Sequence, residues 1–94
     1  MASNELTTRN AYKSRRIRAG LYVTLNGRYR ETRLFERSGK QPPEWLLERG
    51  TFDRSTGEAF GPVERIGQFT NSDRAFQYAA ALDGKAPFPS ESPQ

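Results

Sequence analysis

The cationic side chains of this chain are concentrated in its first part. Residues 1–40 contain ten Lys or Arg and three Glu, a net charge of +7, whereas residues 41–94 contain five Lys or Arg and eight Asp or Glu, a net charge of −3. Twelve of the fifteen cations are Arg, whose planar guanidinium donates paired hydrogen bonds to a phosphate or carboxylate and stacks on aromatic rings. The same basic part carries Tyr12, Tyr22, Tyr29 and Phe35. Basic side chains interleaved with aromatic rings indicate a polyanionic partner, with nucleic acid as the first candidate.

Two groups of residues are the candidate nucleic-acid contacts. The first is the densest cationic run, Lys13 to Arg18, which would follow phosphates as an arm that orders on binding; the alternative is a solvated arm that only keeps the protein soluble. The second is the Arg-rich segment 28–33, which would contact phosphates or base edges, with Tyr29 packed or stacked beside it. Glu31 is nearby, so ion pairing on a plain surface is the alternative there. The predicted nucleic-acid-binding residues are Lys13, Arg15, Arg16, Arg18, Arg28, Tyr29, Arg30 and Arg33.

Trp45 is the candidate for a contact with a protein. The usual place of such a Trp is the core, where it would cover one end of a sheet. The alternative is an exposed anchor, because Trp is enriched among the residues that dominate interface energies. In that case the Arg-rich patch meets an acidic protein surface, and the protein is a non-enzymatic inhibitor or adaptor of the type that phages use to take over a host. A structural subunit of a larger assembly is a third interpretation.

The composition argues against catalysis and metal binding. The chain has no His and no Cys, which removes the commonest general base and metal ligand as well as the thiolate nucleophile. Residues 53–64 match a calcium loop only superficially, because Gly57 replaces a ligand and Glu58 occupies the position that requires Gly. Ser38-Gly39-Lys40 is a fragment of a phosphate-binding loop without its earlier Gly. We therefore predict that the protein is not an enzyme and has no catalytic residue, metal or cofactor.

The clearest structural signal is a β-hairpin over residues 21–35. Apolar and polar residues alternate in its first half, and Asn26-Gly27 between β-prone runs is the strongest short-range hairpin signal, since both residues tolerate the positive φ of a type I′ turn. A two-residue loop pairs Val23 with Arg30. A three-residue loop shifts the second strand by one residue and exchanges its faces, and the sequence leaves both registers open.

Three segments follow the hairpin. Residues 44–49 lie between a Pro pair and a Gly and are predicted to form about two helical turns. Residues 51–60 are predicted to form a second, weaker hairpin. Residues 63–69 are predicted to form a further strand, in which Gly67 marks a bulge.

The last element is the best-delimited helix. Thr70 or Asn71 supplies its N-cap, and Gly84 stands at its end. One apolar face recurs at helical spacing and consists of Ala75, Phe76, Ala79, Ala80 and Leu82. Small Ala side chains allow such a helix to lie close to a sheet. The predicted fold class is therefore α+β, a small antiparallel sheet of three to five strands with one C-terminal helix packed on it.

Composition divides the chain into one domain and two tails. We predict a flexible basic arm over residues 1–16, a single α+β domain over 17–84 and a flexible Pro/Ser-rich tail over 85–94. So small a core stabilises by only ~3–5 kcal/mol without staples, and homodimerisation or ordering on a partner would supplement it. No apolar run reaches ~18 residues and the start of the chain lacks the apolar stretch of a signal peptide. We predict no membrane contact and a cytoplasmic location.

Two segments resemble known DNA-binding domains. Ile66-Gly67-Gln-Phe69 followed by Thr70-Asn-Ser-Asp-Arg-Ala75 is similar to the junction between the third strand and the helix of the plant APETALA-type domain. Asp53-Arg-Ser-Thr-Gly57 resembles the strand–turn of the arm-type-site-binding domain of tyrosine-family phage integrases. Both families place three antiparallel strands in the DNA major groove and back them with one helix. The resemblance implies a DNA-reading sheet, although the segment from Ser38 to Gly50 fits neither family.

The function that these features predict is nucleic-acid binding, with duplex DNA favoured over RNA. The protein would be a small basic regulatory or accessory protein of the kind that phages and mobile elements encode. The rival partner is a protein with an acidic surface.

Overall fold

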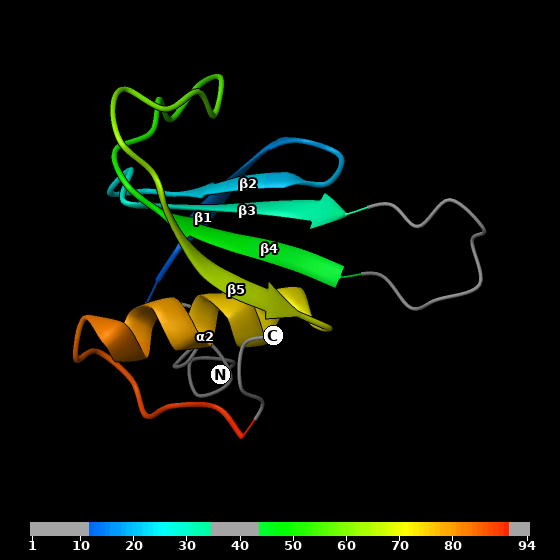
Figure 1. Ribbon diagram of the computed structural model, residues 1–94, viewed down its shortest axis with the longest axis vertical. Coiled ribbons are helices and arrows are strands. Elements are labelled where there is room, and N and C mark those ends of the chain that lie inside the picture. Colours follow the sequence, from blue (N-terminus) through cyan, green and yellow to red (C-terminus); the bar gives the residue numbers. More distant parts are fainter. Residues whose placement is uncertain (1–11, 35–43, 91–94) are drawn as a thin grey trace, which may run out of the picture.

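The structure is a computed structural model that describes residues 12–34 and 44–90. In it, each strand of a five-stranded antiparallel sheet pairs with the next one along the chain, and one helix packs on the sheet (Figure 1). The strands are β1 (Ser14–Arg18), β2 (Leu21–Thr24), β3 (Tyr29–Leu34), β4 (Glu44–Arg49) and β5 (Glu64–Phe69), and the helix is α2 (Ser72–Leu82). The predicted α+β class, with three to five antiparallel strands and a C-terminal helix, is confirmed.

The hairpin of β2 and β3 has the register that a two-residue loop would produce, because Val23 is paired with Arg30. The connection itself is longer and spans residues 25–28. Only Gly27 adopts a positive φ, of 74°, and Asn26 does not, so the predicted type I′ turn is wrong. The Asn26 side chain instead accepts a backbone N–H two residues further on, at 3.0 Å.

Residues 44–49 form β4 and not the predicted helix. The strand is paired with β3 on one side and β5 on the other, so the sheet satisfies its backbone groups. An isolated helix of two turns has no such support, because short helices are marginal in water. The following Gly50 is explained by a close approach: an added Cβ would lie 2.9 Å from the carbonyl oxygen of Pro62.

The segment between β4 and β5 is a loop that lies on the sheet face opposite α2. Its predicted hairpin is reduced to a single bridge between Phe52 and Ala59. The guanidinium of Arg30 lies 4.7 Å from the centroid of the Phe52 ring, which places the loop over β3. Asp53 begins a turn, in which its side chain accepts the N–H groups of residues 55 and 56 at 2.6 and 3.0 Å.

Strand β5 and helix α2 follow the local signals closely. The register between β4 and β5 shifts opposite Gly67, at the predicted bulge. Asn71 is the N-cap of α2, and its side chain accepts the N–H groups of residues 73 and 74. Gly84 has a φ of 73°, and it and residue 85 donate back to the carbonyls of residues 81 and 80, which is a Schellman ending.

The core lies between α2 and the sheet. The buried residues of α2 are Ala75, Phe76, Ala79, Ala80 and Ala81, so Ala81 takes the place that the apolar pattern assigned to Leu82, which is half-buried. Opposite them, Tyr29, Leu47 and Phe69 are fully buried. The small Ala side chains let α2 pack on β3, β4 and β5.

The sheet begins inside the segment predicted to be a flexible arm. Residues 14–16 are already part of β1, and Tyr12 is only 6% exposed; residues 1–11 of the arm lie outside the described part. At the other end, residues 85–90 run back along α2. Phe88 meets Tyr78 edge-on with ring centroids 5.2 Å apart, and Gln77 donates to the carbonyl of Pro87 at 3.1 Å. Residues 91–94 of the predicted tail, and the phosphate-loop fragment Ser38-Gly39-Lys40, are also outside the described residues.

Candidate nucleic-acid interface

Strand β1 forms one edge of the sheet and carries three of the predicted contact residues. Arg15, Arg16 and Arg18 are all exposed. Among the described residues, none of these three side chains takes part in a hydrogen bond or an ion pair. An edge strand has no neighbour on its outer side that could supply a carboxylate. The three guanidinium groups are therefore accessible to a partner.

The pairing of β1 distributes its arginines over both faces of the sheet. Arg15 and Arg18 lie on the face away from α2, with a bulge between Arg16 and Arg18. Arg16 lies on the helix face: it is the cross-strand partner of Tyr22, whose ring contacts Phe76 of α2 with centroids 6.3 Å apart. Such a strand can contact a phosphate backbone along its edge from either side.

Arg30, on β3, is held by the protein itself. Its Nε and Nη2 donate to Oε1 of Glu48 at 3.0 and 2.8 Å, and its Nη1 donates to the carbonyl oxygen of Gly57 at 2.8 Å. Its guanidinium also lies over Phe52. The geometry gives Arg30 a structural role, because it attaches the loop to the sheet and its charge is offset by Glu48. Arg33, an odd number of residues further along the strand, points to the opposite face, so the hairpin arginines do not form one surface.

Tyr29, which was predicted to pack or stack beside the hairpin arginines, is fully buried in the core. Its hydroxyl donates to Oδ1 of Asp83 at 3.1 Å, and the Tyr12 hydroxyl donates to the other oxygen of the same carboxylate. Burial is the main cause that raises the pKa of both hydroxyls, that of Tyr12 to about 12. These bonds connect the end of α2 to β3 and to the residues that precede β1.

The other predicted residues lie around the sheet. Lys13 precedes β1 and Arg28 lies in the β2–β3 connection, and both are exposed. Arg33 is exposed on the helix face, where its cross-strand partner is Trp45. Trp45 is half-buried and meets Tyr22 edge-on with ring centroids 5.8 Å apart. Its ring therefore packs on a side chain of β2 while part of it stays exposed, and both predicted roles of Trp45 stay open.

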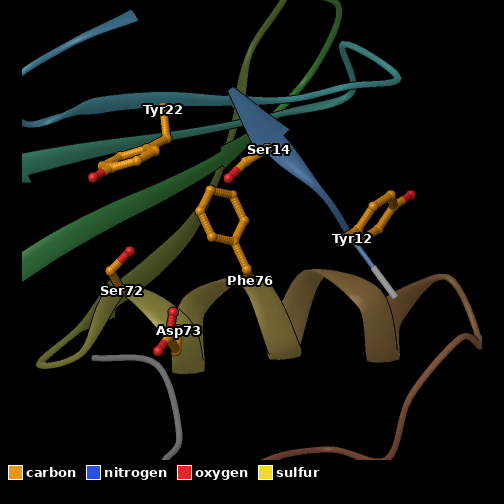
Figure 2. A pocket seen from close by; sticks show the side chains of 6 residues that line it. All are labelled: Tyr12, Ser14, Tyr22, Ser72, Asp73 and Phe76. Atoms are coloured by element: carbon orange, nitrogen blue, oxygen red, sulfur yellow. The ribbon is translucent and has the colours of Figure 1, made fainter. Parts of the chain in front are cut away.

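A narrow cleft separates β1 and β2 from the first half of α2. Because α2 packs on the other three strands, β1 and β2 extend beyond it. The cleft has a volume of about 70 Å³ and is lined by Tyr12, Ser14, Tyr22, Ser72, Asp73 and Phe76. In Figure 2, Phe76 points from α2 toward the strands, while Ser14 and Tyr22 come from the strands above it. Aromatic rings and hydroxyl groups thus meet on the same face as Arg16.

Glu31 is fully buried next to this cleft. The Ser72 hydroxyl donates to its Oε1, whereas its Oε2 has no hydrogen-bond partner among the described residues. Burial raises the pKa of Glu31 to about 8; the Ser72 hydrogen bond opposes this shift and the charge of Asp73 adds to it. From the sequence, Glu31 is an ion-pair partner for neighbouring arginines. Its burial could not be predicted from the sequence, because it depends on the register of the hairpin and on which face of the sheet α2 covers.

The described residues contain no group of three His, Cys, Asp or Glu that could hold a metal ion, and no helix in this part of the chain is long and apolar enough to cross a membrane. Comparison with known proteins finds no family model, no curated protein and no solved structure that matches the chain. The resemblance to the two groups of DNA-binding domains therefore stays a prediction.

Proposed function

We propose that the protein binds nucleic acid through the phosphate backbone, with the edge strand β1 as the main contact. One observation carries the proposal: Arg15, Arg16 and Arg18 stand exposed on five residues of strand and have no carboxylate partner among the described residues. Phosphates match this arrangement, because each guanidinium can make a charge-assisted, bidentate contact with one of them.

A charged edge strand also has a role that needs no partner. Charges on an edge hinder strand pairing between molecules and so prevent aggregation. The two roles differ in their consequences. Edge protection predicts that loss of the β1 charges lowers solubility only, whereas phosphate contact predicts that it weakens a salt-dependent complex.

The salt dependence of binding tests the proposal. The affinity for a labelled oligonucleotide is measured by fluorescence anisotropy as the salt concentration rises. We expect five phosphate contacts, made by Lys13, Arg15, Arg16, Arg18 and Arg28. Five contacts correspond to a fall in affinity of about 100- to 500-fold between about 50 and 200 mM salt, with the smaller value for single strands. No retardation of any oligonucleotide at low salt would overturn the proposal.

A matched pair of variants separates the β1 contact from net charge. Arg15→Gln/Arg18→Gln removes two charges from β1 and should reduce the slope of log affinity against log salt by about 2. Arg65→Gln/Arg74→Gln removes the same charge from β5, at the opposite edge of the sheet, and from α2. The second variant should bind like the wild type. Equal losses in both would mean that net charge alone attracts the ligand.

A protein partner is the second candidate, and the loop before β5 favours it. Phe60 is 68% exposed and Val63 is 38% exposed in this loop. The main chain at Phe60 is attached to the residues that follow β4, since Phe60 N–H donates to the carbonyl of Thr51 at 2.8 Å. An exposed aromatic side chain of this kind can act as an interface anchor. In co-purification from cells, Phe60→Ala should lose a protein that Phe88→Ala, at another exposed ring, retains.

A further inference from the structure

The cleft between the first two strands and α2 has walls that suit a flat ring. Tyr22 and Phe76 both line it and meet edge-on, with centroids 6.3 Å apart and planes at 80°. Phe76 is almost completely buried, whereas Tyr22 is half-buried, so part of the Tyr22 ring remains open. Aromatic rings attract further rings in stacked or edge-on arrangements. A planar, unsaturated group is thus the natural occupant.

The charge of Arg16, next to the cleft, favours a phosphate outside the cleft rather than inside it. Asp73 stands on the α2 wall of the cleft. Arg16 lies outside on the same face of the sheet, next to Tyr22, and attracts an anion there. Ser14, on β1, contributes a hydroxyl that can donate to or accept from a ring substituent. A ligand with a neutral ring and an adjacent phosphate matches this order of groups, and a nucleotide unit has that composition.

The size of the cleft limits what can enter. Its volume of about 70 Å³ is far below the ~300 Å³ or more of pockets that enclose small molecules. A free nucleotide would find little enclosure here, and only the edge of one ring fits. Bases of a duplex are stacked and paired, so they cannot present an edge to a cleft without being extruded. Unpaired bases of a single strand can be splayed out onto aromatic side chains.

We propose that the cleft receives one unpaired base of a single-stranded nucleic acid whose phosphates lie along β1. This inference rests on the proposed phosphate contact and adds the strandedness of the ligand and the place of one base. It differs from the sequence-based expectation of duplex DNA, because the arginines predicted to read base edges do not share a surface whereas the aromatic cleft adjoins Arg16.

The single tryptophan of the chain provides the test. Trp45 contacts Tyr22 with centroids 5.8 Å apart, so its fluorescence reports on an occupant of the cleft. Three probes are titrated at about 50 mM salt: an oligothymidylate of about twelve nucleotides, a duplex of the same length, and inorganic polyphosphate of similar charge. We expect the single strand to quench Trp45 and polyphosphate to bind without quenching it.

Two variants, the first with a matched control, locate the contact. Ser14→Phe fills the cleft from β1 and should weaken single-strand binding about tenfold, the effect of losing one stacked base, without changing polyphosphate binding. Ser14→Ala leaves the cleft open and removes only the hydroxyl, so it should weaken single-strand binding less than Ser14→Phe does. Arg16→Gln should weaken the binding of all three probes. Ser14→Phe adds atoms and removes no core contact. Circular dichroism checks that this variant remains folded.

The outcomes separate the inference from the function on which it rests. If the single strand and the duplex bind alike and neither changes Trp45 emission, the cleft assignment is overturned and the phosphate contact of β1 stands. If Ser14→Phe weakens polyphosphate as much as the single strand, the cleft is not a base site. If no probe binds at all, both the inference and the proposed function are overturned.

Discussion

Arginines occur both on the edge strand β1 and on the central strands, and their surroundings differ. On β3, Arg30 is bonded to Glu48, and on β4, Arg49 is bonded to Glu64 at 2.9 Å. In both cases the Glu is the direct cross-strand partner of the Arg. A central strand offers each Arg a neighbour on both sides, whereas an edge strand offers a neighbour on one side only. Position in the sheet, and not residue type, therefore decides whether a cation is available to a ligand.

This difference also assigns different tasks to the two regions. The central strands carry the buried residues that pack under α2, and their Arg30 and Arg49 are paired with Glu48 and Glu64. The edge strand β1 contributes little to that core and keeps its charges exposed. If this division is correct, substitutions in the centre change stability and those at the edge change binding.

The largest expected effect compares two aliphatic residues, one in each region. Leu47, on β4, is fully buried, and Ile17, on β1, is half-buried. Leu47→Ala should lower the free energy of unfolding by about 2–5 kcal/mol through lost burial and a residual cavity, which is comparable with the whole stability of so small a core. Ile17→Ala should cost about 1 kcal/mol. Urea denaturation measures both, and equal costs would show that the edge is as integral to the core as the centre.

A second prediction concerns Glu31, an ionisable residue of the central strand β3 that has no Arg partner among the described residues. The pKa of Glu31 is about 4.5 in the unfolded chain, and burial raises it to about 8 in the folded protein. Between these values the folded state holds more protons, so the free energy of unfolding falls as the pH rises, by up to about 1.4 kcal/mol per unit. From pH 6 to pH 8 this amounts to about 2–3 kcal/mol.

The control for this prediction is Glu31→Gln, which keeps the shape of the side chain and cannot ionise. Thermal denaturation of both proteins at the two pH values should show that the variant loses much less stability than the wild type. Parallel curves would instead show that Glu31 is already ionised in the folded protein. In that case a buried central charge would exist without a cationic partner, and the contrast between the two regions would be weaker.

Elements that are determined by local interactions were predictable from the sequence. The start of α2 follows from the Asn71 cap, its end from Gly84, and its buried face from the spacing of Ala residues. The hairpin was located by Asn26-Gly27, although the turn differs in type. Each of these signals involves residues within about four positions of one another, a range over which backbone preferences and capping bonds act directly.

Apart from the turn type, the main failures depend on partners far away in the chain. Residues 44–49 became a strand because β3 and β5 lie on either side. Tyr29 became a core residue because α2 covers its face of the sheet, and its partner Asp83 is 54 residues away. Arg30 is neutralised by Glu48, 18 residues further on. The cleft was not predictable, since it exists only where α2 stops short of covering β1 and β2.

The smallest expected effect is the most direct test of the difference between the edge and the centre of the sheet. The same substitution, Arg→Gln, is made once on β3 and once on β1. Arg30→Gln loses the bonds to Glu48 and Gly57, but the pair is partly exposed, with 22% and 16% of the two side chains accessible. We therefore expect a loss of about 1–2 kcal/mol of stability and an unchanged affinity for oligonucleotides. Arg15→Gln should change stability by less than about 0.5 kcal/mol and reduce the affinity a few-fold, as the loss of one phosphate contact does. Chemical denaturation and fluorescence anisotropy on the same two variants give all four values. If Arg30→Gln also weakens binding while it remains folded, the central arginines contribute to the contact surface, and the division between edge and centre does not hold.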